Sequence, residues 1–330
     1  MSVEKVENSN KNMRALDLFS GVGGLSKGVE DSGYFNIVAG VDKDENIVKS
    51  YSENTGNKGI VQDLTKISPI DFEIEYNIEN IDVVTGGPPC QGFSNANVTR
   101  NIENKYNNLI FIFLEYVNHY NPRYFLMENV KGIQQGKMEE KFQTLLQKFR
   151  ESGYNVEWRI LNSANYGVPQ KRKRVFVQGM KNDCVKWPVK THDEEEYTTT
   201  REAIADLPHL SSGERSGILH HNATNHGDDT VKSLDLLSTG ESLYDSWSDS
   251  WKRLPWDEPA WTVTSRNKAV FVHPEQPRLI TERECARLQD LPDSWQFYGN
   301  KDLRFTQIAN AVPPTVVEKI AKSNFERDVY

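Results

Sequence analysis

The chain has 330 residues and a formal net charge of −8; 37% of the residues are hydrophobic and 26% are charged. This length allows roughly two domains of about 150 residues each, and the composition excludes a disordered tail, collagen and a short disulfide scaffold. The acidic balance also argues against a protein that merely coats nucleic acid.

The sequence carries no signal for membrane insertion or export. Its longest apolar stretch, residues 109–117, is interrupted by Glu115 and is far shorter than the roughly 20 residues that cross a bilayer. The first dozen residues lack the apolar centre of a secretory signal. Because the three cysteines, Cys90, Cys184 and Cys285, form no CxxC pair, we expect free thiols, no metal site and a cytoplasmic protein.

Short apolar runs alternate with amphipathic helical patterns through the first half of the chain. This alternation is typical of βαβ units and predicts a doubly wound, parallel α/β sheet of about seven strands. The predicted strands include residues 14–19, 37–42, 81–85, 124–127 and 174–178, and the predicted helices include residues 25–31, 45–53, 109–119 and 139–152.

The second half of the chain is less regular. From residue 183 onward the sequence is rich in Ser, Thr, Asp, Gly and His, which indicates a second, smaller domain. A helix is predicted over residues 281–291, because Thr281 and Glu284 form a T-x-x-E capping box. A final helical segment is predicted over residues 306–322, with a break at its two prolines.

A glycine turn follows the first predicted strand, in the sequence DLFSGVGG at residues 17–24. Glycines let the backbone approach a nucleotide closely, and Asp42, at the end of the next strand, can accept hydrogen bonds from ribose hydroxyls. A dinucleotide fingerprint would need glycine at Ser26, and the lysine of a phosphate-binding P-loop is missing. Taken alone, the turn could equally be a tight connection.

A second motif, GGPPCQGFS at residues 86–94, lies at the carboxyl end of a buried strand, where open α/β sheets bind their ligands. Its glycines and prolines form a rigid turn that presents one thiol, Cys90. A spectator cysteine is the alternative, but such cysteines prefer apolar interiors. Only about 3% of an ordinary thiol is ionised at pH 7, so a nucleophile would need a positive environment.

Charged residues end two other predicted strands. Glu128 follows the strand at residues 124–127 and could share a pocket with Cys90. The densest positive cluster, QKRKR at residues 170–174, precedes another strand, so its alternation sends Arg172 and Arg174 to one face. The alternatives are an exposed strand end for the glutamate and a solvated loop for the cluster.

Six motifs occur in the order and at roughly the spacing of the DNA cytosine-5 methyltransferases, and in them the chain resembles that family, of the bacterial restriction-modification type. The motifs are DLFSGVGG, GGPPCQGFS, MENV, QKRKR, RLITERECARLQ and QIANAVPP. The resemblance implies a Rossmann-like sheet that uses S-adenosylmethionine. It also implies a catalytic and cofactor-binding domain at residues 1–182, completed by residues 303–330, and a smaller irregular target-recognition domain at residues 183–302.

The resemblance implies covalent chemistry on a flipped-out cytosine. Cys90 would add to ring carbon C6, so that C5 can take the methyl group of S-adenosylmethionine and leave S-adenosylhomocysteine. Glu128 would hold or protonate ring nitrogen N3. Arg172 and Arg174 would brace the base oxygen, the neighbouring phosphate and the catalytic loop.

The same resemblance implies a cofactor site in which Asp42 contacts the ribose, Asp63 the adenine amine and Pro88 the sulfonium, while Asn310 returns from the C-terminal part of the chain to close the pocket. The other residues implied at this site are Phe19, Gly21, Gly23 and Leu25.

Double-stranded DNA is the implied partner, although residues 181–258 hold 8 basic against 16 acidic side chains. We therefore expect a few placed groups to contact DNA, namely Gln91, Ser94, Gln170, Lys252, Arg253, Arg266 and Lys268. The loop after Cys90 should close over the base, but it carries Tyr106 where relatives often have arginine. Five of the seven histidines, His192, His209, His220, His221 and His226, raise a zinc hypothesis, yet they lack ligand spacing, so solvated loop histidines are favoured.

Three alternatives remain open. A tRNA cytosine-5 methyltransferase shares these motifs but has a shorter recognition region and a CFT signature that is missing here. A catalytically silent DNA-binding relative would not need Cys90, Glu128 and the two arginines together. The glycine turn alone also fits a nicotinamide dehydrogenase. We expect a monomer, with a cognate restriction endonuclease as a separate partner that the sequence leaves open.

Overall fold

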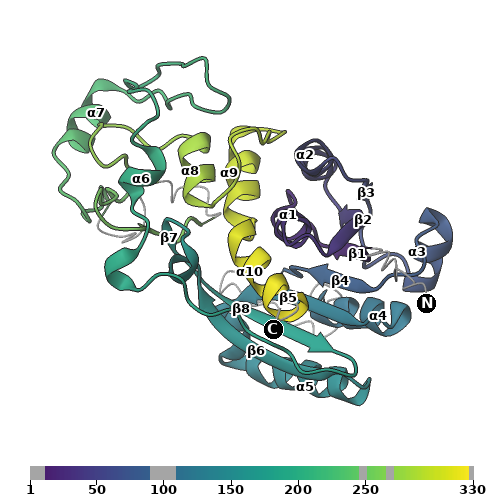
Figure 1. The fold of residues 1–330 in the computed structure, drawn as a ribbon. Helices are drawn as coiled ribbons and strands as arrows, with labels where there is room; N and C mark the ends of the chain where they lie inside the picture. The colour runs from purple at the N-terminus through teal and green to yellow at the C-terminus, as the bar shows by residue number, and fades with distance from the viewer. Residues whose placement is uncertain (1–11, 90–108, 245–250, 265–270, 327–330) are drawn as a thin grey trace, which may run out of the picture.

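The computed structural model describes residues 12–89, 109–244, 251–264 and 271–326. Its centre is a seven-stranded sheet in the order β3-β2-β1-β4-β5-β8-β6 (Figure 1). The strands are β1 (Met13–Leu18), β2 (Phe35–Asp42), β3 (Gly59–Val61), β4 (Val83–Gly86), β5 (Tyr124–Val130), β6 (Asn155–Asn162) and β8 (Lys173–Met180).

The predicted doubly wound α/β sheet is confirmed, but the expectation of a wholly parallel sheet was wrong at one strand. Neighbouring strands from β3 to β5 are parallel, whereas β8 runs antiparallel to both β5 and β6. The reason is the connection from β6 to β8, which holds only a short 3₁₀ turn, Ser163–Tyr166, and the two-residue strand β7 (Gln170–Lys171). A short connection reverses the chain, whereas a parallel crossover needs a dozen or more residues.

Helices cover both faces of the sheet because adjacent strand residues point to opposite sides. Val84 and Phe125 join one core cluster, and their neighbours Val83 and Leu126 join the other. The first cluster is covered by α3 (Pro69–Tyr76), α4 (Leu109–Tyr120) and α5 (Lys137–Glu151), and the second by α1 (Gly24–Asp31) and α10 (Pro314–Phe325).

The last helix lies beside the first one. Figure 1 shows α10 against α1, and the two helices share the second core cluster through Val29 and Val317. The predicted final helical segment is divided into α9 (Lys301–Asn310) and α10, because Pro313 and Pro314 interrupt the helical hydrogen bonds. The C-terminal part of the chain therefore packs on the N-terminal part of the sheet.

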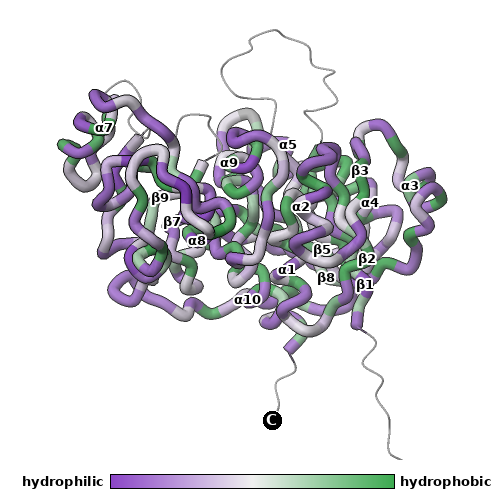
Figure 2. The backbone as a smooth tube through the Cα atoms, turned by 90° about the horizontal axis from the view of Figure 1, so that it is seen from above, coloured by the Kyte–Doolittle hydropathy of each residue, from purple (hydrophilic) through white to green (hydrophobic). Residues whose placement is uncertain are grey.

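The less regular region lies at one side of the sheet, where Figure 1 shows α6 (Thr200–Ile204), α7 (Asp228–Asp235) and α8 (Glu282–Leu288). Its core contains Leu254, Trp295 and Phe297 and continues to Ile308 of α9. Strand β9 (Ala260–Trp261) pairs in parallel with β7 and so connects this region to the sheet domain. Figure 2 shows hydrophobic stretches in the strands of the sheet and largely hydrophilic outer loops.

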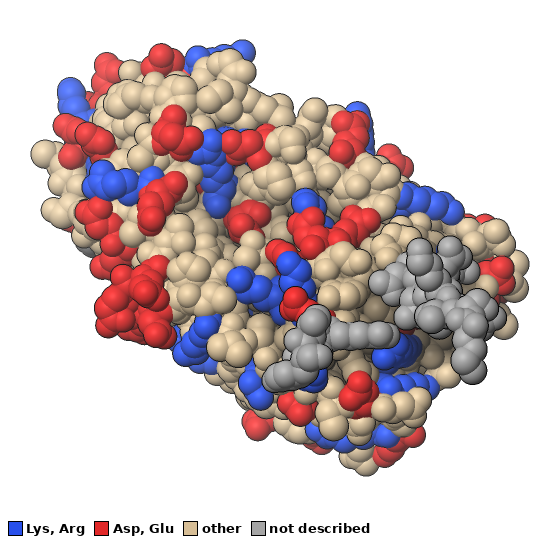
Figure 3. Space-filling model, in the orientation of Figure 1, with Lys and Arg blue, Asp and Glu red and all other residues tan. Residues whose placement is uncertain are grey.

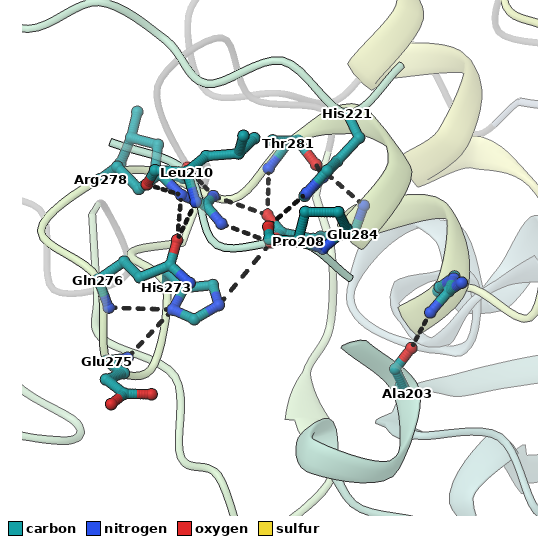
Figure 4. Close-up of polar contacts among 12 residues, drawn as sticks. Ala203, Pro208, Leu210, His221, His273, Glu275, Gln276, Arg278, Thr281 and Glu284 are labelled. Carbon is teal, nitrogen blue, oxygen red and sulfur yellow. Dashed lines mark hydrogen bonds and ion pairs between the residues drawn. The ribbon is translucent and has the colours of Figure 1, made fainter. Parts of the chain in front are cut away.

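A buried ionic network fixes the start of α8 (Figure 4). Thr281 and Glu284 form the predicted capping box. Glu284 also accepts two hydrogen bonds from Arg278, at 2.9 and 2.7 Å, and its carboxylate lies 3.8 Å from His273. Burial raises the pKa of Glu284, but the hydrogen bonds and charge of Arg278 outweigh that effect and leave the pKa lowered.

One histidine of this region is buried and bonded within the chain, which differs from the expected solvated loop position. His221 is buried, with its ring nitrogens bonded to Thr281 Oγ1 and to the carbonyl of Pro208. Among the described residues, no group of three or more His, Cys, Asp or Glu side chains could hold a metal ion. None of the described helices is both long and apolar enough to cross a membrane.

Candidate active site

A cavity of about 340 Å³ opens at the carboxyl ends of β1, β2, β4 and β5. Twelve residues were predicted for catalysis or cofactor binding, and the cavity brings ten of them together. These ten are Phe19, Gly21, Leu25, Asp42, Asp63, Pro88, Glu128, Arg172, Arg174 and Asn310.

The remaining two are Cys90 and Gly23. Cys90 lies outside the described residues, as do Gln91, Ser94, Tyr106, Arg266 and Lys268. Gly23 does not line the cavity. A Cβ at Gly23 would lie 2.5 Å from the Thr55 side chain, so this glycine packs against α2 (Glu45–Thr55).

The next residue, Gly24, lines the cavity in its place. A Cβ at Gly24 would lie 2.1 Å from the carbonyl oxygen of Val312, so only glycine permits this close approach of the two backbones. Both glycines belong to the DLFSGVGG motif, and the sequence pattern could not show which of them faces the ligand. The contact joins the N-terminal turn to the residues between α9 and α10.

Glu128 and two arginines form the charged end of the cavity. Glu128 is buried at the end of β5, and its Oε1 lies 3.2 Å from Nε of Arg174. Burial raises the pKa of Glu128, while the charges of Arg174 and Arg172 oppose that rise. Glu128 therefore holds a proton more readily than an exposed glutamate does.

Arg172 is almost completely buried beside this pair. Its Nη1 donates to the carbonyl of Val263 at 3.3 Å, whereas its Nε has no hydrogen-bond partner among the described residues. Burial lowers the pKa of Arg172 to about 9, so the guanidinium is still charged at neutral pH. The predicted placement of Arg172 and Arg174 on one face is confirmed by the lining of the cavity.

The chain that leads to Cys90 is held next to Glu128. Asn129, which follows Glu128 on β5, donates from Nδ2 to the carbonyl of Pro88 at 2.8 Å. A Cβ at Gly87 would lie 3.5 Å from Oε2 of Glu128. The residue two positions before Cys90 is thus fixed against the strand that carries the glutamate.

The other end of the cavity combines two acids with an apolar wall. Asp42 accepts a hydrogen bond from the backbone N–H of Gly21 at 3.3 Å, and burial raises its pKa. Asp63 accepts from the backbone and hydroxyl of Thr65, at 3.0 and 2.7 Å. The aliphatic residues that line this end are Leu25, Val41, Ile47 and Leu64.

Acids next to aliphatic side chains suit a nucleoside, because carboxylates accept from ribose hydroxyls and the base packs on apolar surface. Ser20 also lines the cavity, and its buried hydroxyl has no hydrogen-bond partner in the part of the chain that the structure describes. An orphaned hydroxyl at the glycine turn indicates a missing ligand group. Sequence reasoning missed Ile47 and Leu64, although Leu64 directly follows Asp63.

Two of the predicted DNA contacts are instead buried inside the protein. Gln170 is fully buried and bonded within the chain. Arg253 is also buried, and its guanidinium donates to the backbone carbonyls of His273, Gln276 and Leu234. We therefore do not assign either residue to DNA. Both corrections have one cause, since a polar pattern in the sequence does not show which buried carbonyls will need donors.

Lys252, in contrast, remains partly exposed, with its ammonium 4.2 Å above the ring of Trp261. The face of the molecule drawn in Figure 3 mixes basic and acidic side chains, and its described residues form no uniform basic track. On this face, affinity for a polyanion would therefore come from particular cations rather than from a general field.

A seven-stranded α/β sheet with a nucleoside-sized cavity at its carboxyl edge is the architecture of methyltransferases that use S-adenosylmethionine. The chain belongs to the family of C-5 cytosine-specific DNA methylases, whose family model matches residues 13–326. It is accordingly a DNA (cytosine-5-)-methyltransferase.

Curated relatives align with nearly the whole length of the chain. Type II methyltransferase M1.HphI of Haemophilus parahaemolyticus is 35% identical over 321 residues, which cover 93% of this chain and 85% of the relative. Type II methyltransferase M.DdeI of Desulfomicrobium norvegicum is 31% identical over 368 residues, covering 94% and 88%. The family assignment and the relation to restriction-modification methyltransferases are therefore confirmed.

Solved structures give the same fold. A prophage-encoded E. coli protein assigned as a DNA modification methyltransferase superposes with a TM-score of 0.81 at 27% identity, covering 94% of this chain and 98% of that one. The Dnmt2 methyltransferase of S. pombe has a TM-score of 0.66 at 20% identity, covering 94% and 96%. The second likeness concerns the fold alone.

Proposed function

We propose that the protein methylates C5 of a cytosine flipped out of a specific duplex DNA sequence, through a transient bond between Cys90 and ring carbon C6. The observation that carries the proposal is the cavity, in which the Glu128–Arg174 pair and the acids Asp42 and Asp63 occupy opposite ends. One end suits a pyrimidine ring, and the other suits the nucleoside part of a cofactor.

The residues present fit S-adenosylmethionine. Asp42 would accept from the ribose, Asp63 from the adenine amine, and Leu25 with Ile47 would cover the apolar faces of the base. The unpartnered hydroxyl of Ser20 offers one further polar contact. When bound, S-adenosylmethionine supplies a methyl group on a positively charged sulfur, which a carbon nucleophile can accept.

The side chains of the protein would convert C5 of the cytosine into that carbon nucleophile. As a thiolate, Cys90 would add to C6, and the electrons of the C5–C6 double bond would shift toward C4 and N3, which leaves an enamine with a nucleophilic C5. Glu128, whose pKa is raised by burial, holds a proton at ring nitrogen N3 and so limits the negative charge. After C5 has been methylated, water takes the C5 proton, the C5–H electrons form the C5–C6 double bond, and the Cys90–C6 bond breaks with its electrons on sulfur. The N3 proton returns to Glu128, and the thiolate is restored.

The arginines would stabilise this charge distribution. Arg174 lies against Glu128, and the Nε of Arg172 is available to a ligand in the cavity. Their positive charges also favour the thiolate form of a nearby cysteine. Arginine suits this role because its planar guanidinium contacts a carboxylate, a base oxygen or a phosphate with several donors.

We further propose a division of labour between the two parts of the chain. Residues 1–182, completed by residues 303–330, would hold the cofactor and the reacting base, and residues 183–302 would contact the target sequence. A base inside a duplex cannot reach the cavity and must be flipped out. Contacts between the protein and the DNA must offset the unstacking cost of a few kcal/mol. Of the predicted cations in the described residues, Lys252, which is partly exposed, would contribute to DNA binding.

The test has two steps. Bisulfite sequencing of DNA from cells that express the protein first identifies the methylated sequence. A duplex with 5-fluorocytosine at that position should then trap the protein covalently in the presence of S-adenosylmethionine, because fluorine cannot leave as a proton.

The exposed cysteine Cys184 provides a matched control. Cys184→Ala should still form the adduct, and Cys90→Ala should form none. An adduct that survives Cys90→Ala would overturn the assignment of the nucleophile. Methyl transfer to tRNA but not to duplex DNA would favour the tRNA alternative, and methylation of neither would favour a silent relative.

A further inference from the structure

Two buried glutamines lie at the junction of the sheet domain, the less regular region and the cofactor cavity. Gln170 belongs to β7, and Gln289 caps the C-terminal end of α8. Both side chains are fully buried, and each uses its amide oxygen and its amide nitrogen in hydrogen bonds. Among the described residues, neither side chain is hydrogen-bonded to Glu128, Arg172 or Arg174, and Gln170 contacts Arg172 only through the backbone, where the Arg172 N–H donates to the Gln170 carbonyl at 2.9 Å.

The hydrogen bonds of these side chains form one continuous path. Gln170 Oε1 accepts from the backbone N–H of Val263 at 3.0 Å. Gln170 Nε2 donates to Gln289 Oε1 at 2.6 Å and to the carbonyl of Leu288 at 2.9 Å. Gln289 Nε2 then donates to the carbonyl of Ala311. The path therefore runs from Val263 to Ala311 through buried groups alone.

The direction of each amide is fixed by its neighbours. If Gln170 turned over, its NH₂ group would face the N–H of Val263; if Gln289 turned over, its NH₂ group would face that of Gln170. A change at one end of the path must therefore be absorbed by the other members, since both side chains are fully buried and already use their amide groups within the path.

At one end of the path, residues 260–263 are hydrogen-bonded to β7 and to the residue before it. Ala260 N–H donates to the carbonyl of Pro169 at 3.0 Å, and Thr262 Oγ1 donates to the carbonyl of Lys171 at 2.8 Å. The carbonyl of Val263 accepts from Arg172, which lines the reaction cavity. This segment thus connects the region proposed to contact DNA with an arginine of the reacting site.

At the other end of the path, Ala311 lines the cavity together with its neighbours Asn310 and Val312. We call these three residues the cofactor wall. Val312 is in close contact with Gly24 of the glycine turn, where even a Cβ atom has no space. A small displacement of Ala311 must therefore change the shape of the cofactor cavity.

We propose that Gln170 and Gln289 are positioning residues that couple residues 260–263 to the cofactor wall, so that DNA and cofactor bind cooperatively. The inference rests on the proposed function, because it takes DNA as the ligand of the less regular region. When DNA fixes residues 260–263, the two amides fix Ala311, and the cofactor then binds to a wall that is already ordered.

The test measures linkage rather than activity. The dissociation constant of S-adenosylhomocysteine is determined by calorimetry for the full chain, alone and saturated with a duplex carrying the methylated sequence. Coupling factors between sites are typically on the order of 5- to 150-fold, and we expect DNA to tighten binding to the wild-type protein about tenfold. Reciprocity requires S-adenosylhomocysteine to tighten DNA binding by the same factor.

Two variants of one residue interrupt the path. Gln289→Glu keeps the acceptor for Gln170 and loses the donor to Ala311, and Gln289→Leu loses both. Both should reduce the coupling to less than about twofold, below the typical range of such factors, while the affinity for S-adenosylhomocysteine alone changes less than the coupling does. The matched control is Gln178→Leu, because Gln178 is also fully buried but bonds to Tyr124 and Lys186.

The outcomes are distinct. Loss of coupling in both Gln289 variants and its persistence in Gln178→Leu would support the proposal. Full coupling in a folded Gln289 variant, no coupling in the wild-type protein, or unfolding of both variants would overturn it. If the wild-type protein methylates DNA without coupling, this inference fails and the proposed function stands; if it neither methylates DNA nor binds S-adenosylhomocysteine, the proposed function fails.

Discussion

Two of the buried glutamates in the described residues, Glu284 and Glu128, are paired with arginines in ways that differ in nearly every respect. Glu284 and Arg278, in the less regular region, share two short hydrogen bonds, and the carboxylate also accepts from the backbone N–H of Thr281 (Figure 4). Glu128 and Arg174, in the cavity, share one contact of 3.2 Å. The pKa of Glu284 is lowered, and that of Glu128 is raised.

The difference shows how one chemical pair serves two purposes. A buried carboxylate that is completely satisfied stays charged and fixes the local structure. A buried carboxylate with one ionic contact, next to an arginine nitrogen that has no partner among the described residues, is prepared to exchange a proton with a ligand. The first pair is therefore expected to determine stability, and the second to determine rate.

The largest expected effect is on catalysis. Glu128→Gln should lower the rate of methylation by about 10²- to 10⁴-fold, because the amide cannot hold a proton at N3 of the base. Tritium transfer from labelled S-adenosylmethionine to duplex DNA measures the rate, and thermal unfolding should show a protein about as stable as the wild type. If Glu128→Gln unfolds easily but is fully active, the Glu128–Arg174 pair has a structural role like that of the Glu284–Arg278 pair.

The equivalent change in the other pair should act on stability. Glu284→Gln leaves Arg278 as a buried charge without its partner, which typically costs about 3–5 kcal/mol of unfolding free energy. Urea unfolding measures that loss, and the folded fraction should keep its methylation rate. The exposed helical pair of Glu318 and Lys322 is the control, since Glu318→Gln should cost less than about 1 kcal/mol.

The smallest expected effect is on how the folding stability depends on pH, and its direction should differ between the two glutamates. Glu284 has a lowered pKa in the folded state, so its contribution to stability is present above its unfolded pKa of about 4.3 and is lost as the pH falls. Glu128 has a raised pKa, so its contribution is complete at low pH and is lost as the pH rises above about 4.3.

Urea unfolding between pH 4 and 7, for the wild type and each Gln variant, isolates the two contributions. As the pH rises, the unfolding free energy of the wild type should increase relative to that of Glu284→Gln. Relative to that of Glu128→Gln, it should decrease. The same slope for both variants would contradict the distinction between the pairs.

Much of the fold could be predicted because its signals are local. The capping box of Thr281 and Glu284 and the glycine turn are set by neighbours in sequence. Strand β6 was missed, although Val156, Trp158 and Ile160 alternate with polar residues in the period-two pattern of a strand. The direction of β8 depends on the length of the connection before it, which strand patterns do not encode.

The site was predictable where a motif fixes the backbone, and not where burial decides the role. Glu128 and Arg174 meet because β8 runs antiparallel to β5, which places the first residues of β8 beside the last residues of β5. Gln170 and Arg253 look like ligands for DNA in the sequence, yet each provides donors to the interior. Which carbonyls lack donors is known only after the less regular region has packed on the sheet.

The order of synthesis gives the joining of α1 with α10 a further meaning. A ribosome releases the glycine turn early, but Asn310, Ala311 and Val312, which complete the cavity wall, follow only after the less regular region has been translated. Until α10 has been made, Val29 lacks its partners on that helix. A nascent chain thus cannot form the complete cavity, and it becomes competent to modify DNA only after the residues through α10 have been translated.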